Sequence, residues 1–494
     1  MVDPTPEQLA VVDAHQRGQH LVVQAGAGCG KSSTLRLLGA ADRRRMLYVA
    51  YNKAIATDAA ASFPRTVSCS TAHSLAFRAV GTQYAHRLRG PRQTAFDAAR
   101  ILDVPRLLDI SGPAAIVNDL GDQTAMPTPK IMRIALETVT RWCYSADFEI
   151  AARHLPRRPG LQKPETLAQL GALVLPVARA AWRDLLRTNG LLKFQHDHYL
   201  KMWQLGRPRL RADVVLLDEA QDTNDVVADV LLHQDHAQRI AVGDSAQQIY
   251  EWRGANDALA QFEQRLGAEQ LTLSRSFRFG PAIAEAANAW LYIVGAPIRL
   301  TGHDPIPSRV GRVKDPQAVL CRTNAGAMTV VMDYLAAGRR VALVGGGDEM
   351  QRLARAAEQL LAGQPTDHPE LSAFSTWQQV REYAEDEADG ADLRVLVKLI
   401  DEHGPRAIQA ATASLTGEDQ ADITVSTAHR SKGREWDRVL IHDDFRPPSP
   451  DPVTKLVTVR REEARLAYVA VTRARLDLDA TALEWVCDVR AVAA

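Results

Sequence analysis

The chain has 494 residues, more than one hydrophobic core organises, so about three or four domains are expected. With 46% hydrophobic and 24% charged residues the composition is that of a globular chain, which excludes disordered and fibrous classes. Lysine plus arginine equals aspartate plus glutamate at 59 each, so the formal charge is zero. A field of the whole molecule therefore cannot attract a polyanion, and any nucleic-acid site must be a local cleft.

The cysteines and the apolar stretches indicate a cellular compartment. The five cysteines are scattered without a CxxC pair, which favours isolated thiols in a reducing environment over a structural zinc or iron–sulfur site. The most apolar stretch, 170–182, is broken by Pro176 and Arg179 and is shorter than the roughly 20 residues of a membrane-spanning helix. No basic, apolar leader opens the chain. We therefore expect a cytoplasmic protein with no membrane partner.

Short apolar runs alternate with longer helical patterns along the chain, which predicts an α/β fold with parallel sheets. Residues from about 85 to 205 are expected to be mainly helical, with arginine-rich connectors. Residues from about 351 to 420 are expected to be helices that carry a solvated acidic face. The predicted strands lie at 21–23, 46–50, 214–217, 239–242, 318–321, 340–344, 423–426 and 438–441.

A glycine-rich segment follows the first predicted strand and precedes a helical pattern. Its small residues let consecutive backbone N–H groups surround a polyphosphate at the positive end of that helix. Lys31 would neutralise the β- and γ-phosphates, and the Ser32 hydroxyl would ligate Mg²⁺, so ATP and Mg²⁺ are expected. The strand before and the helix after favour this reading over a chance turn, although Ala25 stands where the general pattern has glycine. The candidate nucleotide-binding residues are Ala25, Gly26, Ala27, Gly28, Cys29, Gly30, Lys31, Ser32 and Ser33.

Two carboxylates follow the predicted strand at 214–217. A buried strand that ends in Asp218 and Glu219 places a Mg²⁺ ligand and a base for the attacking water side by side. Alone, such a pair is often a helix N-cap, but together with Lys31 it indicates a hydrolytic site. The stretch between Lys31 and Asp218 is too long for a small P-loop kinase, so the helical block at 85–205 is an insertion.

An ordered series of motifs resembles the UvrD/Rep/PcrA group of superfamily 1A DNA helicases over nearly the whole chain. The match at 243–255 is the most specific. Residues 51–56 and 194–205 are most similar to the F-box DNA helicases and their phage and bacterial relatives. The matching segments are 5–8 (glutamine motif), 48–54 (motif Ia), 70–74 (a single-strand-contacting motif), 243–255 (motif III), 274–278 (motif IV), 426–436 (motif V) and 462–474 (motif VI).

This resemblance implies two RecA-like parallel-sheet lobes with ATP between them, and two mainly helical inserted subdomains. The first lobe would be formed in two parts, with the helical insertion between them. The second lobe would likewise be divided, by an insertion that is smaller than is usual in the family. The expected segments are 1–84 and 206–275 for the first lobe, 85–205 for its insertion, 276–350 and 421–494 for the second lobe, and 351–420 for the reduced insertion.

The resemblance also implies roles for individual residues around ATP. Gln8 would read the adenine edge and Phe277 would stack on the ring. Arg278 and Arg473 would both reach the γ-phosphate, where guanidinium groups stabilise the charge that develops during phosphoryl transfer. Further roles fall on Gln247, which would report the nucleotide state to the DNA side, and Glu435, which would bond the ribose.

The expected DNA contacts are of two kinds. Aromatic side chains would stack on unpaired bases without regard to sequence. Polar and basic side chains would contact backbone phosphates and fix register. The stacking candidates are Tyr51, Tyr250 and Trp252, and the others are Asn52, Lys53, Thr71, His73, Arg253 and His429.

The expected function is a monomeric ATP-dependent helicase that moves 3′ to 5′ on single-stranded DNA and acts at junctions with duplex, in a bacterial or phage-infected cytoplasm. One alternative is a single-strand translocase that displaces proteins with little unwinding. Another is a nucleotide-gated DNA-binding switch, which would need neither both arginines nor the base.

Overall fold

The computed structural model describes residues 3–488 except 92, 113, 120, 122, 158–160, 250–256, 365, 367, 369, 370, 372, 373, 375, 387–390 and 449–456. The chain divides into two compact units. The first contains Met1–Gln24 and Lys31–Thr272, and the second contains Ala25–Gly30 and Leu273–Ala494. The lobe and insertion boundaries given above stay a prediction.

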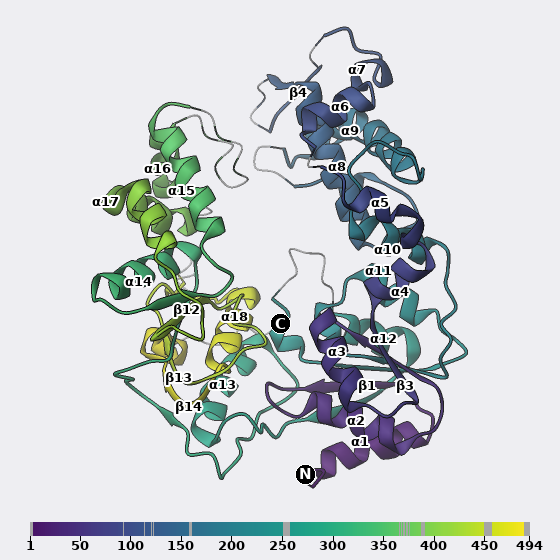
Figure 1. The fold of residues 1–494 in the computed structure, drawn as a ribbon, viewed down its shortest axis with the longest axis vertical. Coiled ribbons are helices and arrows are strands. Elements are labelled where there is room, and N and C mark those ends of the chain that lie inside the picture. The colour runs from purple at the N-terminus through teal and green to yellow at the C-terminus, as the bar shows by residue number, and fades with distance from the viewer. Residues whose placement is uncertain are drawn as a thin grey trace. The chain divides into compact units, whose positions relative to one another are not determined.

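The first unit contains a parallel sheet, its covering helices and a helical insertion (Figure 1). Up to the end of the insertion its elements are α1 (Pro6–Gln16), β1 (Leu21–Ala25), α2 (Lys31–Ala41), β2 (Met46–Ala50), α3 (Lys53–Ser62), β3 (Val67–Thr71), α4 (Ala72–Ala79), η1 (Gly81–Tyr84), α5 (Ala85–Leu88), α6 (Ala95–Ile101), α7 (Val104–Leu107), β4 (Ala114–Val117), β5 (Gln123–Met126), α8 (Thr128–Tyr144), η2 (Ala152–His154), α9 (Pro164–Leu185) and α10 (His196–Leu205). It continues with β6 (Val214–Leu217), η3 (Ala220–Asp222), α11 (Asp225–Leu232), β7 (Gln238–Gly243), η4 (Ser245–Gln247), α12 (Ala258–Leu266) and β8 (Glu269–Leu273).

The first sheet has the strand order β3-β2-β6-β7-β1-β8. The pairs β2–β3, β2–β6, β6–β7 and β1–β7 are all parallel. The inner strands β2, β6 and β7 are buried along their whole length, as the near-continuous apolar runs of a doubly covered sheet predict. Because parallel strands end at the same edge, the segments after β2, β3, β6 and β7 come together there.

The insertion of the first unit extends away from its sheet (Figure 1). Its long helices α8 and α9 pack together through an edge-to-face contact of Trp142 and Trp182, whose ring centroids are 4.8 Å apart. The ammonium group of Lys201 lies 4.6 Å from the Trp142 ring centroid and donates to the Ser145 carbonyl oxygen at 2.9 Å. This buried cation joins α10 to the end of α8. The antiparallel pair β4–β5 also lies in the insertion and was not predicted.

His198 in α10 gives the insertion a measurable pH dependence. Burial lowers the pKa of its imidazole to about 4, and its Nδ1 accepts from the Gln195 backbone N–H at 3.0 Å. The pKa of His198 is thus lower in the folded than in the unfolded protein. The contribution of this neutral imidazole to the free energy of unfolding is therefore fully present above pH 6.5 and is lost as the pH falls towards 4. We expect His198→Gln to remove about 2 kcal/mol of the stability difference between pH 7 and pH 5, measured by urea unfolding. An equal pH dependence in both proteins would contradict this.

The second unit contains another six-stranded sheet and its helices. Its elements are α13 (Pro281–Val294), β9 (Arg309–Val310), β10 (Ala318–Cys321), α14 (Asn324–Ala336), β11 (Val341–Leu343), α15 (Asp348–Leu361), α16 (Trp377–Asp386), α17 (Ala391–Ala413), β12 (Ile423–Thr427), β13 (Trp436–Ile441), α18 (Arg461–Val471), β14 (Ala474–Asp479) and η7 (Thr481–Asp488).

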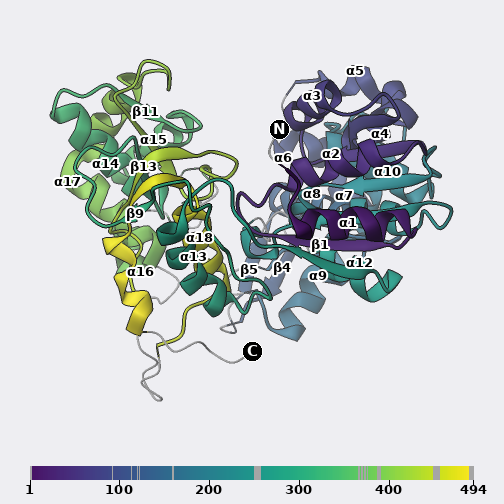
Figure 2. The same ribbon diagram turned by 90° about the horizontal axis from the view of Figure 1, so that it is seen from below.

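The second sheet has the order β11-β12-β10-β13-β14-β9, and its strand pairs are parallel. Its strands lie between α14 on one side and α13 with α18 on the other (Figure 2). Beyond it, α16 is held to α17 because Asp401 accepts from Trp377 Nε1 at 2.8 Å and pairs with Arg381. The predicted α/β class is confirmed. In the described part of the chain, we find no helix with the length and apolarity needed to cross a membrane.

Candidate nucleotide and nucleic-acid site

Lys31 and Glu219 form an ion pair in the first unit. Lys31 begins α2 directly after the glycine-rich loop, and its Nζ lies 2.8 Å from Glu219 Oε2. Burial lowers the pKa of Lys31, but the carboxylates of Glu219, Asp244 and Asp218 raise it further, so the net pKa is raised. The lysine is therefore a cation at neutral pH. The two residues that the sequence paired as phosphate ligand and base are thus brought together.

Asp218 is buried at the end of β6 and has a defined orientation. Its carboxylate accepts from Tyr48 Oη at 2.5 Å and from the Glu219 backbone N–H at 2.9 Å. Burial raises the pKa of Asp218 above its usual range, and the Glu219 charge adds to this. Burial and the carboxylates also raise the pKa of Tyr48, so its hydroxyl remains a donor. Tyr48 opens the motif Ia segment, but no role at this site was predicted for it.

The backbone at Glu219 has an unusual conformation. Its φ of 49° and ψ of 46° place it in the left-handed region, which non-glycine residues rarely occupy. Strained backbone of this kind is found at sites where the side-chain direction matters. The conformation turns the chain from β6 into the short helix η3 and directs Glu219 towards Lys31.

Gln247 is linked to this group of residues through side chains that the motif reading did not single out. Gln221 Nε2 donates to Glu219 Oε2 at 2.6 Å, and Gln221 Oε1 accepts from the Asp244 backbone N–H at 2.9 Å. Asp244 Oδ2 in turn accepts from Gln247 Nε2 at 2.6 Å. A continuous path of hydrogen bonds therefore runs from Lys31 to Gln247.

Gln8, the predicted adenine reader, is a buried residue of α1. Its Oε1 accepts from the Thr5 backbone N–H at 3.0 Å in a capping box, and its Nε2 donates to Thr34 Oγ1 at 3.1 Å. A side-chain amide has a second proton and a second lone pair for a ligand. The structure therefore gives Gln8 a role in joining α1 to α2. Ser32 and Ser33 lie exposed in the first turn of α2, where Ser33 Oγ accepts from Arg36 Nη2 at 3.2 Å.

The loop Ala25–Gly30 groups with the second unit. Within that unit the Ala27 backbone N–H donates to Tyr468 Oη at 3.1 Å, and Ser276 Oγ donates to the Ala27 carbonyl oxygen at 2.9 Å. The Phe277 N–H donates to the Gly28 carbonyl oxygen at 2.9 Å. Gly28 has a φ of 74°, and a Cβ there would lie 2.6 Å from Arg278 Cβ. Conformation and close approach together require glycine at this position.

Arg278 and Arg473 are brought together in the second unit by Thr472. Arg278 Nη1 donates to the Thr472 carbonyl oxygen at 3.1 Å, and Arg473 Nη2 donates to Thr472 Oγ1 at 3.1 Å. Arg473 is almost fully buried and also donates from Nε to the Val469 carbonyl oxygen at 2.9 Å. The two arginines predicted to act on one phosphate are therefore neighbours.

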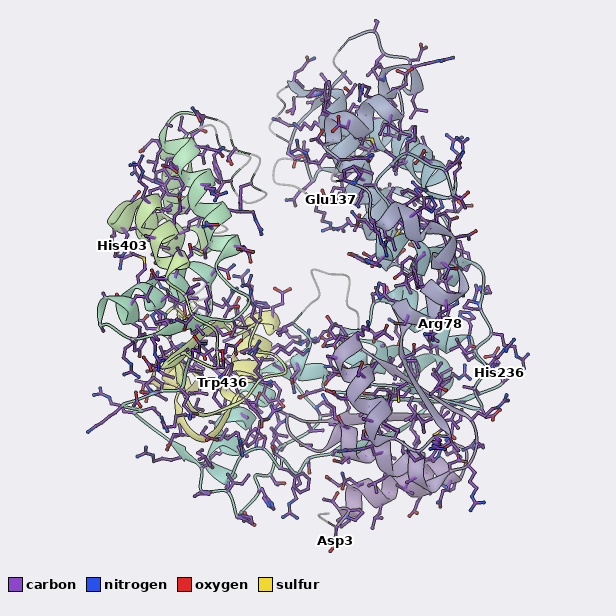
Figure 3. The ribbon with its side chains drawn as sticks, in the orientation of Figure 1. Asp3, Arg78, Glu137, His236, His403 and Trp436 are labelled. Atoms are coloured by element: carbon purple, nitrogen blue, oxygen red, sulfur yellow. The ribbon has the colours of Figure 1, made fainter. Side chains whose placement is uncertain are left out.

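Glu435, predicted to bond the ribose, pairs with a predicted phosphate ligand. Its Oε2 accepts from Arg278 Nε at 2.7 Å. Glu435 precedes Trp436, which begins β13 and is labelled in Figure 3. The structure thus assigns Glu435 a role in orienting Arg278.

Phe277, the predicted stacking partner of adenine, is half-buried. The Arg275 guanidinium carbon lies 5.7 Å from the Phe277 ring centroid, and the His303 ring centroid lies 5.5 Å from it.

The DNA-contact candidates of motif Ia and of the following motif lie after the neighbouring strands β2 and β3, whose last residues Ala50 and Thr71 are paired. Asn52 and Thr71 are helix N-caps: their side chains accept from the backbone N–H groups three residues on, in α3 and α4. Both side chains therefore stabilise helix ends, which is the ordinary role of these residue types. Tyr51 and Lys53 are exposed beside them.

His73 is held by an acidic residue of α10. Its Nε2 lies 3.2 Å from Asp197 Oδ1, and its ring meets Tyr199 edge-on. Burial raises the pKa of Asp197, but the bonds and charge of His73 lower it more, so Asp197 is ionised. Nearby, Arg78, labelled in Figure 3, donates to Ser70 Oγ at 3.1 Å. A phosphate at His73 would have to compete with the Asp197 carboxylate.

His429 differs from the expectation for a charged phosphate contact. Burial, and after it the Arg322 charge, lowers the pKa of His429 to about 4. The imidazole is therefore neutral at physiological pH and is available as a hydrogen-bond partner but not as a cation. Arg322 itself pairs with Glu463 through two hydrogen bonds of 2.6 and 2.8 Å. The candidates Tyr250, Trp252 and Arg253 lie outside the described residues.

Cys321, His442 and Asp444 have ligand atoms within 4.8 Å of one another at the end of the second sheet. Asp444 already accepts from the Arg322 and Thr323 backbone N–H groups at 2.8 and 2.9 Å, and from the Thr323 hydroxyl at 3.0 Å. Its carboxylate is thus occupied in fixing the start of α14. Burial also raises the pKa of the Cys321 thiol well above its usual range. Both observations favour a structural role for this cluster.

Two helicase family models match the chain. The UvrD/REP helicase N-terminal domain matches residues 182–266, and the UvrD-like helicase C-terminal domain matches residues 350–483. The F-box DNA helicase protein 1 of Schizosaccharomyces pombe is 28% identical over 95% of this chain and 56% of its own length. The F-box DNA helicase 1 of Gallus gallus is 29% identical over 93% of this chain and 47% of its own length. The chain spans about half the length of these curated relatives.

These relatives correct one expectation. A bacterial or phage-infected cytoplasm was predicted, but the similar proteins come from a fission yeast and a bird, so the prediction is wrong. Its physical basis was weak, because scattered thiols and polar helices are compatible with several reducing compartments. The two parallel sheets and both family matches indicate two RecA-like lobes with helical insertions. The chain is therefore similar to the UvrD-like DNA helicases in both of its units.

Proposed function

We propose that the chain is an ATP-dependent DNA helicase motor that moves 3′ to 5′ on single-stranded DNA and separates strands at junctions with duplex. The observation that carries the proposal is the group formed by the buried Asp218 with the partly buried ion pair of Lys31 and Glu219 at the carboxyl end of the first sheet. It combines a phosphate-binding cation with two carboxylates that have different environments. The two similar proteins are named as DNA helicases, which supports DNA as the substrate.

The proposed hydrolytic step uses these residues in distinct roles. Lys31 exchanges its ion pair with Glu219 for the β- and γ-phosphates of ATP. Glu219 then accepts a proton from water, whose oxygen bonds to the γ-phosphorus as the bond to the β–γ bridging oxygen breaks, giving ADP and phosphate. The guanidinium groups of Arg278 and Arg473 stabilise the charge that develops on the γ-phosphate.

The donor set at the end of β6 suits Mg²⁺. Asp218 offers a carboxylate that is already oriented by Tyr48, and Ser32 offers a hydroxyl in the first turn of α2. Hard oxygen ligands of this kind are those Mg²⁺ prefers. Bound Mg²⁺ would supply neutralising charge to the β- and γ-phosphates. In the same proposal Gln8 and Phe277 hold the adenine, and the backbone of Ala25–Gly30 and Ser33 surround the phosphates.

For DNA we propose stacking by Tyr51, Tyr250 and Trp252 on unpaired bases. The polar and basic candidates then contact the DNA phosphates. His73 would do so after release from Asp197, and His429 would act as a neutral hydrogen-bond partner. The remaining members of that set are Asn52, Lys53, Thr71 and Arg253. The protein would act as a monomer, with the single strand and the junction as its partners.

The function is tested by ATP turnover with single-stranded DNA, duplex DNA and RNA, followed by unwinding of duplexes that carry a 3′ or a 5′ tail. We expect turnover to rise most with single-stranded DNA, and unwinding to require a 3′ tail. Displacement of a tail-bound protein without unwinding would favour the translocase alternative. Tight DNA binding with no turnover above the Lys31→Ala background would favour the switch.

Trp252→Ala tests the stacking proposal separately. Removing the indole is expected to weaken binding to oligothymidylate and oligodeoxyadenylate alike, by about tenfold, because each stacked base contributes about 1–3 kcal/mol. Fluorescence anisotropy with labelled oligonucleotides measures the affinity, and ATP turnover without DNA is the control, expected to be unchanged. A defect confined to one base composition would contradict stacking.

A further inference from the structure

Gln221 lies between two motifs and contacts both. It belongs to η3, directly after the carboxylates, and its side chain is fully buried. Its amide nitrogen donates to Glu219 Oε2 at 2.6 Å, the oxygen that Lys31 also reaches. Its amide oxygen accepts from the Asp244 backbone N–H at 2.9 Å. A side-chain amide offers a donor at one end and an acceptor at the other, which suits these two partners.

The neighbouring strand leaves space for this side chain. An added Cβ at Gly243, the last residue of β7, would lie 2.3 Å from Gln221 Oε1 and 3.1 Å from the Ala220 nitrogen. Backbone atoms and a fully buried amide cannot move away cheaply. The absence of a side chain at Gly243 is therefore what allows Gln221 to reach the Asp244 backbone.

The contact continues into residues 244–247, which precede the DNA candidates Tyr250 and Trp252 in the sequence. Asp244 is buried and accepts from Ala246 N–H at 3.1 Å and from Gln247 Nε2 at 2.6 Å. The short helix η4 that contains Gln247 is further fixed by Gln24, which donates from Nε2 to Ser245 Oγ at 2.7 Å. The position of the Glu219 carboxylate and the conformation of residues 244–247 are thus joined through one amide.

We infer that Gln221 is the positioning residue for the Glu219 carboxylate and joins it to the 244–247 segment. This inference rests on the proposed ATP hydrolysis. Gln221 holds the carboxylate oxygen by an N–H bond and cannot itself take a proton from water, so it acts through Glu219. The path Lys31–Glu219–Gln221–Asp244–Gln247 gives the nucleotide site a direct connection to the segment that leads into Tyr250 and Trp252.

Two substitutions separate the bonds of Gln221. Gln221→Leu removes these bonds and the longer one, of 3.5 Å, from the amide nitrogen to Asp222 Oδ2. Gln221→Glu retains an acceptor for the Asp244 N–H but replaces the donor to Glu219 with a carboxylate. We expect kcat for ATP with Mg²⁺ and oligothymidylate to fall about 10- to 100-fold in both variants, as for other residues that orient a catalytic group. The KM for ATP is expected to change by less than about threefold, because ground-state phosphate contacts remain.

The stoichiometry of ATP binding distinguishes positioning from a loss of folded protein. A variant in which only the Glu219 carboxylate is misplaced should bind as much ATP per chain as the wild type and turn it over more slowly, whereas unfolded protein would bind less.

Gln234→Leu is the matched control. Gln234 is equally buried in the first unit, its Oε1 accepts from the Leu210 N–H at 2.8 Å and its Nε2 donates to the Pro208 carbonyl oxygen at 2.9 Å. It contacts none of the proposed catalytic residues in the described contacts. Gln234→Leu should lower the melting temperature about as much as Gln221→Leu, with kcat unchanged.

The outcomes separate this inference from the proposed function. A wild-type protein without DNA-stimulated ATP turnover would remove the proposed function. An active wild type, with folded Gln221 variants that retain its kcat, would overturn the inference alone. If Gln221→Leu does not fold, Gln221→Glu decides the question, because it retains the bond to the Asp244 backbone.

Discussion

Glu219→Gln is expected to lower DNA-stimulated ATP turnover by about 10³-fold, within the 10²- to 10⁴-fold that general-base catalysis contributes. The amide retains the size of the side chain and its hydrogen-bonding capacity, but it cannot accept the proton of the attacking water. Because the Lys31 ammonium would lose its charged partner, ATP affinity should not fall. Steady-state phosphate release with saturating oligothymidylate, with ATP binding measured separately, gives both quantities.

Lys31→Ala completes this test from the other side of the ion pair. It should abolish turnover and also weaken ATP binding, because the lysine contacts phosphates in the ground state as well as in the transition state. Glu263→Gln, on the exposed face of α12, is the control for a lost carboxylate in the same unit and should leave turnover unchanged. Normal turnover in both Lys31→Ala and Glu219→Gln would remove the assignment of this site.

Arg473→Lys and Arg278→Ala are each expected to reduce kcat by about 10³-fold, the lower range for arginines that stabilise transferring phosphoryl groups. Lysine is chosen at position 473 because that side chain is almost fully buried and donates to the Val469 carbonyl oxygen. The lysine ammonium retains the positive charge of arginine but lacks the planar guanidinium, which can donate two parallel hydrogen bonds. Arg278 is more accessible, so truncation there leaves less buried polar surface unpaired.

The measurement is single-turnover hydrolysis with saturating protein, which isolates the chemical step from product release. Arg309→Ala is the control: Arg309 forms an exposed ion pair with Asp477 in the same unit and should have no effect on kcat. Circular dichroism and thermal melting establish that the variants are folded. Folded Arg473→Lys and Arg278→Ala proteins with wild-type rates would contradict the role of both arginines.

The strand positions could be predicted where both faces of the strand are covered. Strands β2, β6, β10 and β12 are nearly continuous apolar runs, because parallel strands in the middle of a sheet are buried on both faces. The strands β3, β8 and β14, of which β3 and β8 lie at the two edges of the first sheet, were missed. Their polar and apolar residues alternate or are mixed, and short segments of this kind resemble exposed loops.

The sequence by itself determined the α/β class, the positions of the glycine-rich loop and of the adjacent carboxylates, and the helicase resemblance, since each motif consists of residues that are near one another in the chain. Only the tertiary structure decided the partners and the charge states. Gln221 acquires its role from Asp244 on the neighbouring strand, Arg278 from Glu435, and the neutral state of His429 from burial beside Arg322. Hydrogen bonds act only over about 3 Å, and a pKa depends on the local surroundings, so both follow from contacts between residues that are distant in sequence.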